Sequence, residues 1–166
     1  MEKEKLPDYV APCSLLCYTC MGFKDGPISE CAKKLYIYTE GICEFRSAHM
    51  SEEQREEWHS FFHEYHDTLK NLSGTSCPGC RNNPVSCSAF EGCVIPACVK
   101  ERGVDFCAEC DAFPCQKARD FFAARDEELS RVWENGSRRL KEVGMDAYFE
   151  EKKDISHYIH YKKDPD

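Results

Sequence analysis

The sequence CPGCRNNPVSCSAFEGCVIPACVKERGVDFCAECDAFPC, residues 77–115, holds eight of the chain's 13 cysteines. Two of its pairs, Cys77/Cys80 and Cys107/Cys110, have the C-x-x-C spacing, in which a tight turn brings two thiolates onto one small cation. The stretch is poor in large aliphatic residues and rich in Gly, Pro and Cys, so apolar burial alone is too small to fold it. Bound metal would supply the missing free energy. We therefore predict that residues 73–117 fold around metal ions.

A second cysteine group lies near the N-terminus, where Cys13, Cys17 and Cys20 form a C-x3-C-x2-C triplet. Radical-SAM enzymes use this spacing to bind a four-iron cluster on a partial or full α/β barrel. This chain lacks the alternation of strands and helices that such a barrel requires, and it is short for one. We interpret the triplet as three metal ligands that need a fourth thiolate from the later stretch. Residues 11–24 and 73–117 would then form one cysteine-rich, metal-binding lobe.

The charge and length of the chain restrict its partners and its location. The 166 residues suit a single domain, 1–166, and the formal net charge is −8. Two tetrathiolate zinc sites would take this charge to about −12, which makes nucleic acid an unlikely partner. The charged N-terminus lacks the apolar segment of a signal peptide, and no apolar run is long enough to span a membrane. We expect a cytoplasmic protein without membrane contact.

The expected compartment also bears on the cysteines. In a reducing environment, frequent cysteines indicate metal or redox chemistry rather than disulfide bonds. The odd number of cysteines fits a set of disulfide pairs poorly as well. Cys31 and Cys43 stand apart from the other cysteines, and we interpret them as small core residues.

Helical patterns flank the cysteine-rich lobe. A capping box, Ser51-Glu-Glu-Gln54, precedes an apolar stripe that predicts a helix over residues 51–72. The helical part of the molecule is predicted to comprise residues 27–72 and 114–156. No convincing strand is found, so the predicted fold class is mainly α, a small helical bundle with an irregular cysteine-rich metal-binding lobe.

Three glycine positions are expected to shape these helices. Gly103 is predicted to end a short helix over residues 95–102. Asn135-Gly136 is predicted to break or kink the helical region after Cys115, and Gly144 to cap a helix there. Cys115 itself stands at the start of a predicted helix, where the helix dipole and the backbone N–H groups would stabilise a metal thiolate. The same environment would alternatively lower the pKa of a reactive cysteine.

The cysteine order resembles that of the cysteine-rich bacterial and archaeal family catalogued as domain of unknown function 3795. The resemblance rests on APCSLLCYTC near the start, CPGC in the middle, and CVIPACVKERGVDFCAECDAFPC. It implies a cysteine-rich, zinc-binding protein without an assigned reaction. Ser14 departs from the family, which usually has Gly there, and Phe90 stands where a cysteine would be expected. Cys87 is a candidate to replace that ligand from a shifted loop.

Spacing and resemblance together give the predicted metal ligands, although they do not pair them. The ligands are Cys13, Cys17, Cys20, Cys77, Cys80, Cys87, Cys93, Cys98, Cys107, Cys110 and Cys115. All-sulfur coordination suits structural zinc, and two or more ions are expected. An iron–sulfur cluster is the alternative, because it uses the same thiolates.

The expected function is therefore that of a structural zinc protein, which acts as an interaction or regulatory module toward an unknown protein partner. The competing interpretation is an iron–sulfur redox or electron-transfer protein. No Ser-His-Asp constellation, phosphate loop or recognisable carboxylate pair occurs, which argues against an enzyme. A thiol enzyme with one open zinc position is a third alternative.

Overall fold

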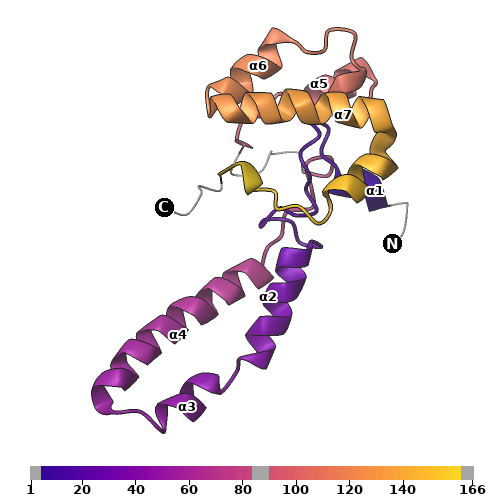
Figure 1. The fold of residues 1–166 in the computed structure, drawn as a ribbon. Helices are drawn as coiled ribbons and strands as arrows, with labels where there is room; N and C mark the ends of the chain where they lie inside the picture. The colour runs from indigo at the N-terminus through magenta and orange to yellow at the C-terminus, as the bar shows by residue number, and fades with distance from the viewer. Residues whose placement is uncertain (1–4, 84–89, 162–166) are drawn as a thin grey trace. The chain divides into compact units, whose positions relative to one another are not determined.

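Helices dominate the computed structural model, which describes residues 5–83 and 90–161 (Figure 1). They are α1 (Leu6–Tyr9), α2 (Pro27–Tyr38), α3 (Ile42–Ser47), α4 (Glu52–Ser73), α5 (Ile95–Arg102), α6 (Gln116–Ala123), α7 (Glu127–Lys152) and the 3₁₀ turns η3 (Cys107–Glu109) and η4 (Ile159–Tyr161). Within the described ranges the extended pairing is one antiparallel bridge, between Val10 and Leu16. The mainly α prediction is confirmed. No helix in these ranges is both long enough and apolar enough to cross a membrane.

The contacts divide the chain into two units. The cysteine unit comprises Met1–Cys20 and Cys77–Asp166, and the hairpin unit comprises Met21–Ser76. The hairpin unit is therefore one continuous stretch set between the first and the second cysteine motif. The expected division into a cysteine-rich lobe and a helical part stays a prediction.

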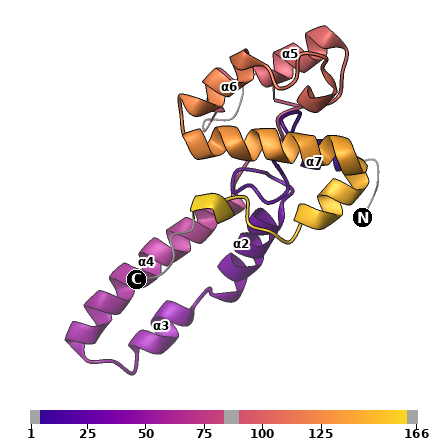
Figure 2. The ribbon, with the colours of Figure 1, turned by 45° about the horizontal axis from the view of Figure 1, so that its top comes forward.

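The hairpin unit is built from α2 and α4, which lie antiparallel and side by side, with α3 between them in the chain (Figures 1 and 2). The predicted capping box is present, because the Gln54 backbone N–H donates to the Ser51 hydroxyl and the Gln54 side chain accepts from the Ser51 backbone. Phe62 and Leu69 are buried on the inner face of α4. The predicted helix over residues 51–72 is thus confirmed.

The two isolated cysteines of this unit differ in burial. Cys43 is buried, and the Trp58 indole N–H donates to its carbonyl oxygen at 3.3 Å, so its interpretation as a core residue is confirmed. Cys31 lies exposed on α2, and its interpretation as a core residue was wrong. Its position among apolar residues at helical spacing suggested burial, but the core of this unit lies toward Ser29 and Ala32 instead.

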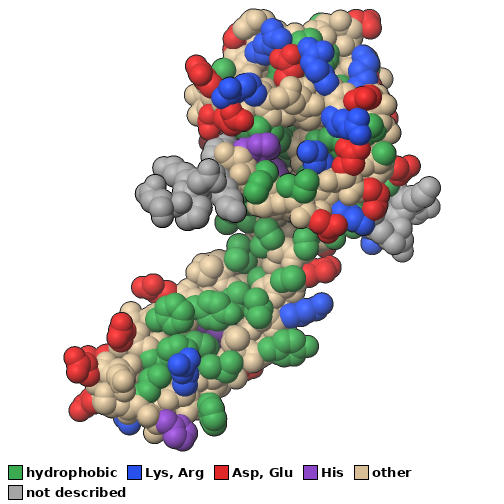
Figure 3. Space-filling view, in the orientation of Figure 1, with side chains coloured by type: hydrophobic (Ala, Val, Ile, Leu, Met, Phe, Trp, Pro, Cys, Tyr) green, Lys and Arg blue, Asp and Glu red, His purple; other side chains and the backbone are tan. Residues whose placement is uncertain are grey.

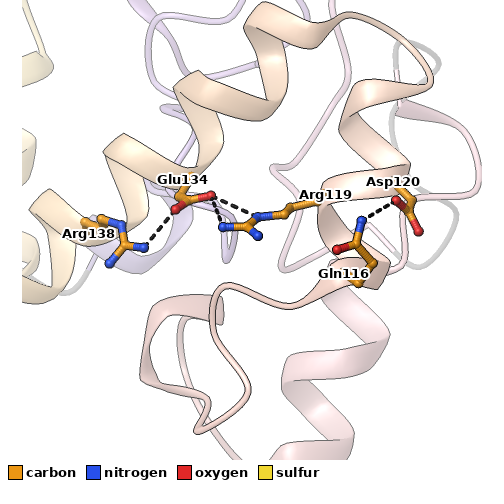
Figure 4. Close-up of polar contacts among 5 residues, drawn as sticks. All are labelled: Gln116, Arg119, Asp120, Glu134 and Arg138. Carbon is orange, nitrogen blue, oxygen red and sulfur yellow. Dashed lines mark hydrogen bonds and ion pairs between the residues drawn. The ribbon is translucent and has the colours of Figure 1, made fainter.

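The core of the cysteine unit forms where α6 packs along α7 (Figure 2). Trp133 and Phe149 of α7 and Phe122 of α6 are fully buried, and the rings of Phe122 and Trp133 stack with centroids 5.5 Å apart. An ion-pair network at the edge of this contact holds the two helices together (Figure 4). The Glu134 carboxylate accepts from Arg119 of α6 at 2.9 Å and from Arg138 of α7 at 2.7 Å. These two partners lower the pKa of Glu134.

The predicted break at Asn135-Gly136 was wrong, because α7 continues through both residues. Gly136 does not form a turn. Its missing side chain instead leaves room for Ser14 and Tyr148 to lie close to the helix backbone. A Cβ built on it would lie 2.9 Å from the Ser14 hydroxyl oxygen and 3.0 Å from the Tyr148 hydroxyl oxygen. The interruption falls at Gly144, which has φ 79° and ψ 167°, and the helix resumes after it to Lys152. Gly103 ends α5 in the left-handed region at φ 65°, as predicted.

Candidate functional site

Four cysteines from three consecutive elements line one small cavity of the cysteine unit. Cys98 comes from α5, Cys107 and Cys110 come from η3 and the residue that caps it, and Cys115 caps the N-terminus of α6. We call them the α5–α6 thiol group. The cavity measures about 10 Å³, which is the room that one water-sized body needs.

Backbone capping in the loops fixes this group in place. The Glu109 carboxylate accepts the backbone N–H groups of Asp105 and Phe106, at 2.9 and 3.0 Å. The Cys107 N–H donates to the Pro12 carbonyl at 2.8 Å, which ties η3 to the N-terminal segment. The sequence pattern did not indicate this role of Glu109. Its position two residues after a C-x-x-C cysteine, followed by a short turn, was the only signal for its capping role.

Burial and the neighbouring thiols both affect the ionisation of Cys107. Burial raises the pKa of Cys107 to about 12, and the neighbouring thiols of Cys115, Cys98 and Cys110 add to this shift. The indole of Trp133 opposes it by hydrogen bonding to the thiolate form. The Trp133 N–H is fully buried and has no hydrogen-bond partner among the described residues, and it lies near enough to the Cys107 thiol to lower its pKa. Such an N–H donor stabilises a thiolate, which is the form that binds a metal ion.

A second set of thiols joins the N-terminal triplet to the middle of the chain. Burial raises the pKa of Cys13 well above its usual range, and the thiols of Cys80 and Cys93 raise it further. The pKa of Cys80 is raised first by a hydrogen bond with Cys17 and then by burial. We call Cys13, Cys17, Cys80 and Cys93 the N-terminal thiol group.

Contacts between α1 and the chain after the C-P-G-C motif hold Cys80 in this position. The Arg81 side chain donates to the Pro7 carbonyl at 2.8 Å, and the Asn82 amide donates to the Asp8 carboxylate at 2.7 Å. The left-handed Gly79, at φ 90°, supplies the turn between the two cysteines of the motif.

The remaining predicted ligands stand outside these two groups. Cys20 and Cys77 are half-buried, and the Cys20 sulfur lies 3.7 Å from the Tyr158 hydroxyl. Cys87 lies outside the described residues.

The thiols are donor atoms of the kind that a metal ion binds, but they are not yet close enough to one another to hold one. In residues 5–83 and 90–161, no three Cys, His, Asp or Glu side chains are already arranged to hold a metal ion. A cation would therefore have to draw the thiols of either group closer together. The donor set is nonetheless one that zinc and iron–sulfur clusters prefer, since it offers four thiols, a small cavity and a buried N–H donor beside one sulfur.

Polar contacts around Ser14 attach the N-terminal cysteine loop to α7. Ser14 has φ 69°, so it occupies the left-handed region that favours glycine. Its hydroxyl donates to the Trp133 carbonyl at 3.4 Å and accepts from the Ser137 hydroxyl at 3.1 Å. The Tyr148 hydroxyl donates to the Ser14 carbonyl at 2.9 Å. All of these groups are buried.

The sequence pattern did not reveal the roles of Ser137 and Tyr148. One signal was present, because Ser137 is a polar residue on the stripe that also carries the buried Trp133 and Leu140. A polar residue at such a position indicates a buried hydrogen-bond partner.

Comparison with known proteins identifies one family. The model of a family described as protein of unknown function (DUF3795) matches residues 9–120, a range that contains all eleven predicted ligands. No curated protein and no solved structure matches the chain.

Proposed function

The chain belongs to this family of proteins of unknown function (DUF3795), and we propose that it is a structural zinc protein that acts in the cytoplasm as an interaction or regulatory module. The observation that carries the proposal is the α5–α6 thiol group. Its cysteines come from α5, η3 and the cap of α6, yet all four line a single cavity. Short loops with so few large aliphatic residues gain their folding free energy from a bound ion.

One zinc ion would be held by Cys98, Cys107, Cys110 and Cys115, and a second by the N-terminal thiol group. Zinc bound by four thiolates is closed to substrate and supplies folding free energy rather than catalysis. Trp133 would donate its buried N–H to the Cys107 thiolate, and the α6 N-terminus would favour the charge on Cys115. Cys20, Cys77 and Cys87 remain as candidates for a third or an enlarged site.

The hairpin unit supports the interaction half of the proposal. Large apolar side chains are exposed on it, and Figure 3 shows them gathered over α2, α3 and α4. Tyr38 and Phe45 are 75% and 74% exposed, and Phe61 is 58% exposed. Exposed apolar patches of this kind mark surfaces that contact other proteins.

An iron–sulfur redox protein is the second candidate. The observation that favours it is the concentration of cysteines around the N-terminal thiol group, where Cys20 and Cys77 add two further thiols in sequence. Such clusters are bound by cysteine thiolates, and the C-x3-C-x2-C triplet belongs to the N-terminal group.

Metal analysis separates the two candidates. The full chain is purified without oxygen and without nickel affinity resin, and its metals are measured by mass spectrometry together with an absorption spectrum. We expect two or more zinc ions per chain and no visible absorption band. Cys110→Ser should lose one zinc ion, whereas the matched control Cys31→Ser, at an exposed isolated cysteine, should keep all of them. Iron with sulfide would reverse the ranking, and the absence of any metal would refute both candidates.

A further inference from the structure

A second cavity of the cysteine unit lies away from the α5–α6 thiol group. It has a volume of about 500 Å³, which is within the range of small-molecule sites. Three segments line it. They are the loop that carries Ser14 and Thr19, residues of α7 between Glu128 and Tyr148, and the segment from Lys152 to His160. The His157 ring donates to the Leu16 carbonyl at 2.9 Å and so closes the segment against the loop.

Basic side chains outnumber carboxylates in the lining of this cavity, although the chain as a whole is acidic. The whole chain has 30 acidic and 22 basic residues. In the cavity lining, Arg139, Lys152 and the two histidines His157 and His160 meet a single carboxylate, that of Glu128. This carboxylate is already paired with Arg131. Figure 3 shows histidine, basic and apolar side chains together in the region below α7. Arg139 is ion-paired with Glu142 and Glu151 outside the lining, and burial lowers the pKa of His157. Lys152 is therefore the cation of this lining whose charge no carboxylate of the described residues pairs with.

The two permanent cations have donors to spare. Lys152 acts electrostatically on the neighbouring Glu151, but it forms no hydrogen bond or ion pair with any described residue. Arg139 gives three N–H groups to the carboxylates of Glu142 and Glu151. A guanidinium has five N–H groups, so two remain. Thr19, which also lines the cavity, is buried, and its hydroxyl has no partner among the described residues.

One part of the remaining lining is aliphatic, and it lies beside the polar Ser14, Asn135 and Ser156. Leu16, Val132, Ile155 and Ile159 supply the aliphatic part, and Ile155 and Ile159 are 41% and 43% exposed. Aliphatic side chains beside spare cationic donors suit a ligand with one anionic end and one apolar end. An inorganic anion alone would leave the aliphatic wall in contact with water.

We propose that this cavity binds a small organic anion, with its carboxylate or phosphate on Lys152 and Arg139 and its apolar body against Leu16 and Val132. The site is independent of the proposed zinc function, although its wall is the loop between Cys13 and Cys20. A ligand there would contact the loop of the N-terminal thiol group.

Titration by heteronuclear NMR tests the proposal on the full, metal-loaded chain. Phenyl phosphate and benzoate are the anionic probes, and they distinguish phosphate from carboxylate as the preferred end. Benzyl alcohol is the neutral probe, and inorganic phosphate tests the anion without an apolar body. We expect one of the two aromatic anions to shift the amide signals of residues 14–19 and 152–160 and to bind at least about tenfold more tightly than benzyl alcohol or inorganic phosphate.

Matched variants make the result specific to the cavity. Lys152→Gln should weaken binding of the aromatic anion about tenfold, because a charge-assisted hydrogen bond is lost. The control Lys153→Gln should leave it unchanged, since Lys153 pairs with Glu150 and does not line the cavity. Asn135→Trp, at an exposed lining position, should block binding by filling the cavity.

Several outcomes would overturn the proposal. They are no binding of either anion, equal binding of the neutral probe, equal weakening by Lys153→Gln, or shifts confined to the apolar surface of the hairpin unit. Unchanged zinc content in Lys152→Gln would show that a loss of binding is separate from the proposed zinc function.

Discussion

Tyr148 donates its hydroxyl hydrogen to the carbonyl of Ser14 across 134 positions of sequence, at 2.9 Å. Both residues are buried, and burial raises the pKa of Tyr148 to about 12, so the phenol stays a donor at any physiological pH. The bond joins the loop of Cys13 and Cys17 to the segment of α7 that follows the Gly144 interruption. The position of the N-terminal thiol group therefore depends on a helix that contains none of its cysteines.

Tyr148→Phe should destabilise the protein by about 1–2 kcal/mol, because the buried Ser14 carbonyl loses its side-chain donor. Urea unfolding with matched metal content measures the change. Tyr38→Phe is the control, since Tyr38 is 75% exposed and should change stability by less than about 0.5 kcal/mol. Equal effects of the two substitutions would contradict the role of the buried bond.

At Ser14, alanine should be less stable than glycine by about 1 kcal/mol. Both substitutions lose the hydroxyl contacts, but only alanine keeps a Cβ in the left-handed region at φ 69°. The measurement is the urea midpoint of Ser14→Ala and of Ser14→Gly. If alanine proved as stable as glycine, the left-handed conformation of this residue would be wrong.

Gly136→Ala should destabilise the protein although alanine favours a helix by about 1 kcal/mol. The new Cβ would lie 2.9 Å from the Ser14 hydroxyl oxygen, which is closer than such atoms approach. Ser14→Gly removes that oxygen, so the double variant should be more stable than the sum of the two single changes. Strict additivity in the double-mutant cycle would exclude the contact between these positions.

The metal-free protein should lose stability as the pH rises above about 8.5, the usual pKa of a free thiol. The folded state raises the pKa of Cys107 to about 12, so it holds a proton that the unfolded chain releases. A raised pKa contributes stability below the unfolded value and loses it as the pH approaches the folded value, at about 1.4 kcal/mol for each pH unit. Unfolding at pH 7.5 and 9.5, after chelation and with reductant, measures this loss.

Cys107→Ala should flatten that dependence on pH, and an unchanged slope would contradict the assignment. Bound zinc should reverse the sign, because it requires the thiolate and releases protons on binding. Zinc affinity should therefore rise over the same interval in which the metal-free protein weakens.

The sequence predicted the elements whose signals are local. The capping box at Ser51 and the glycine stop at Gly103 each depend on residues within a few positions, and the structure has both. The break at Asn135-Gly136 failed because the role of Gly136 depends on Ser14, which is distant in sequence. Local turn chemistry cannot separate a glycine that ends a helix from one that admits a neighbouring loop.

The candidate site shows the same limit. The cysteine spacing gave the candidate ligands, but their grouping depends on how the chain folds back on itself. Cys98 joins Cys107 because α5 turns at Gly103, and Cys13 meets Cys80 because α1 binds the chain after the C-P-G-C motif. The resemblance to the family also pointed to Ser14 as a departure, and its positive φ gives the physical reason why glycine suits that position.

The hairpin unit comprises every residue between Cys20 and Cys77. Its helices α2 and α4 run antiparallel and pack along each other. The thiols of Cys17 and Cys80 interact across that interval. The number of residues between the two motifs is therefore free to change by whole helical turns, or by exchange of the hairpin, while the sulfurs stay together. A search for related chains should therefore fix the spacing inside each motif and leave the number of residues between the motifs open.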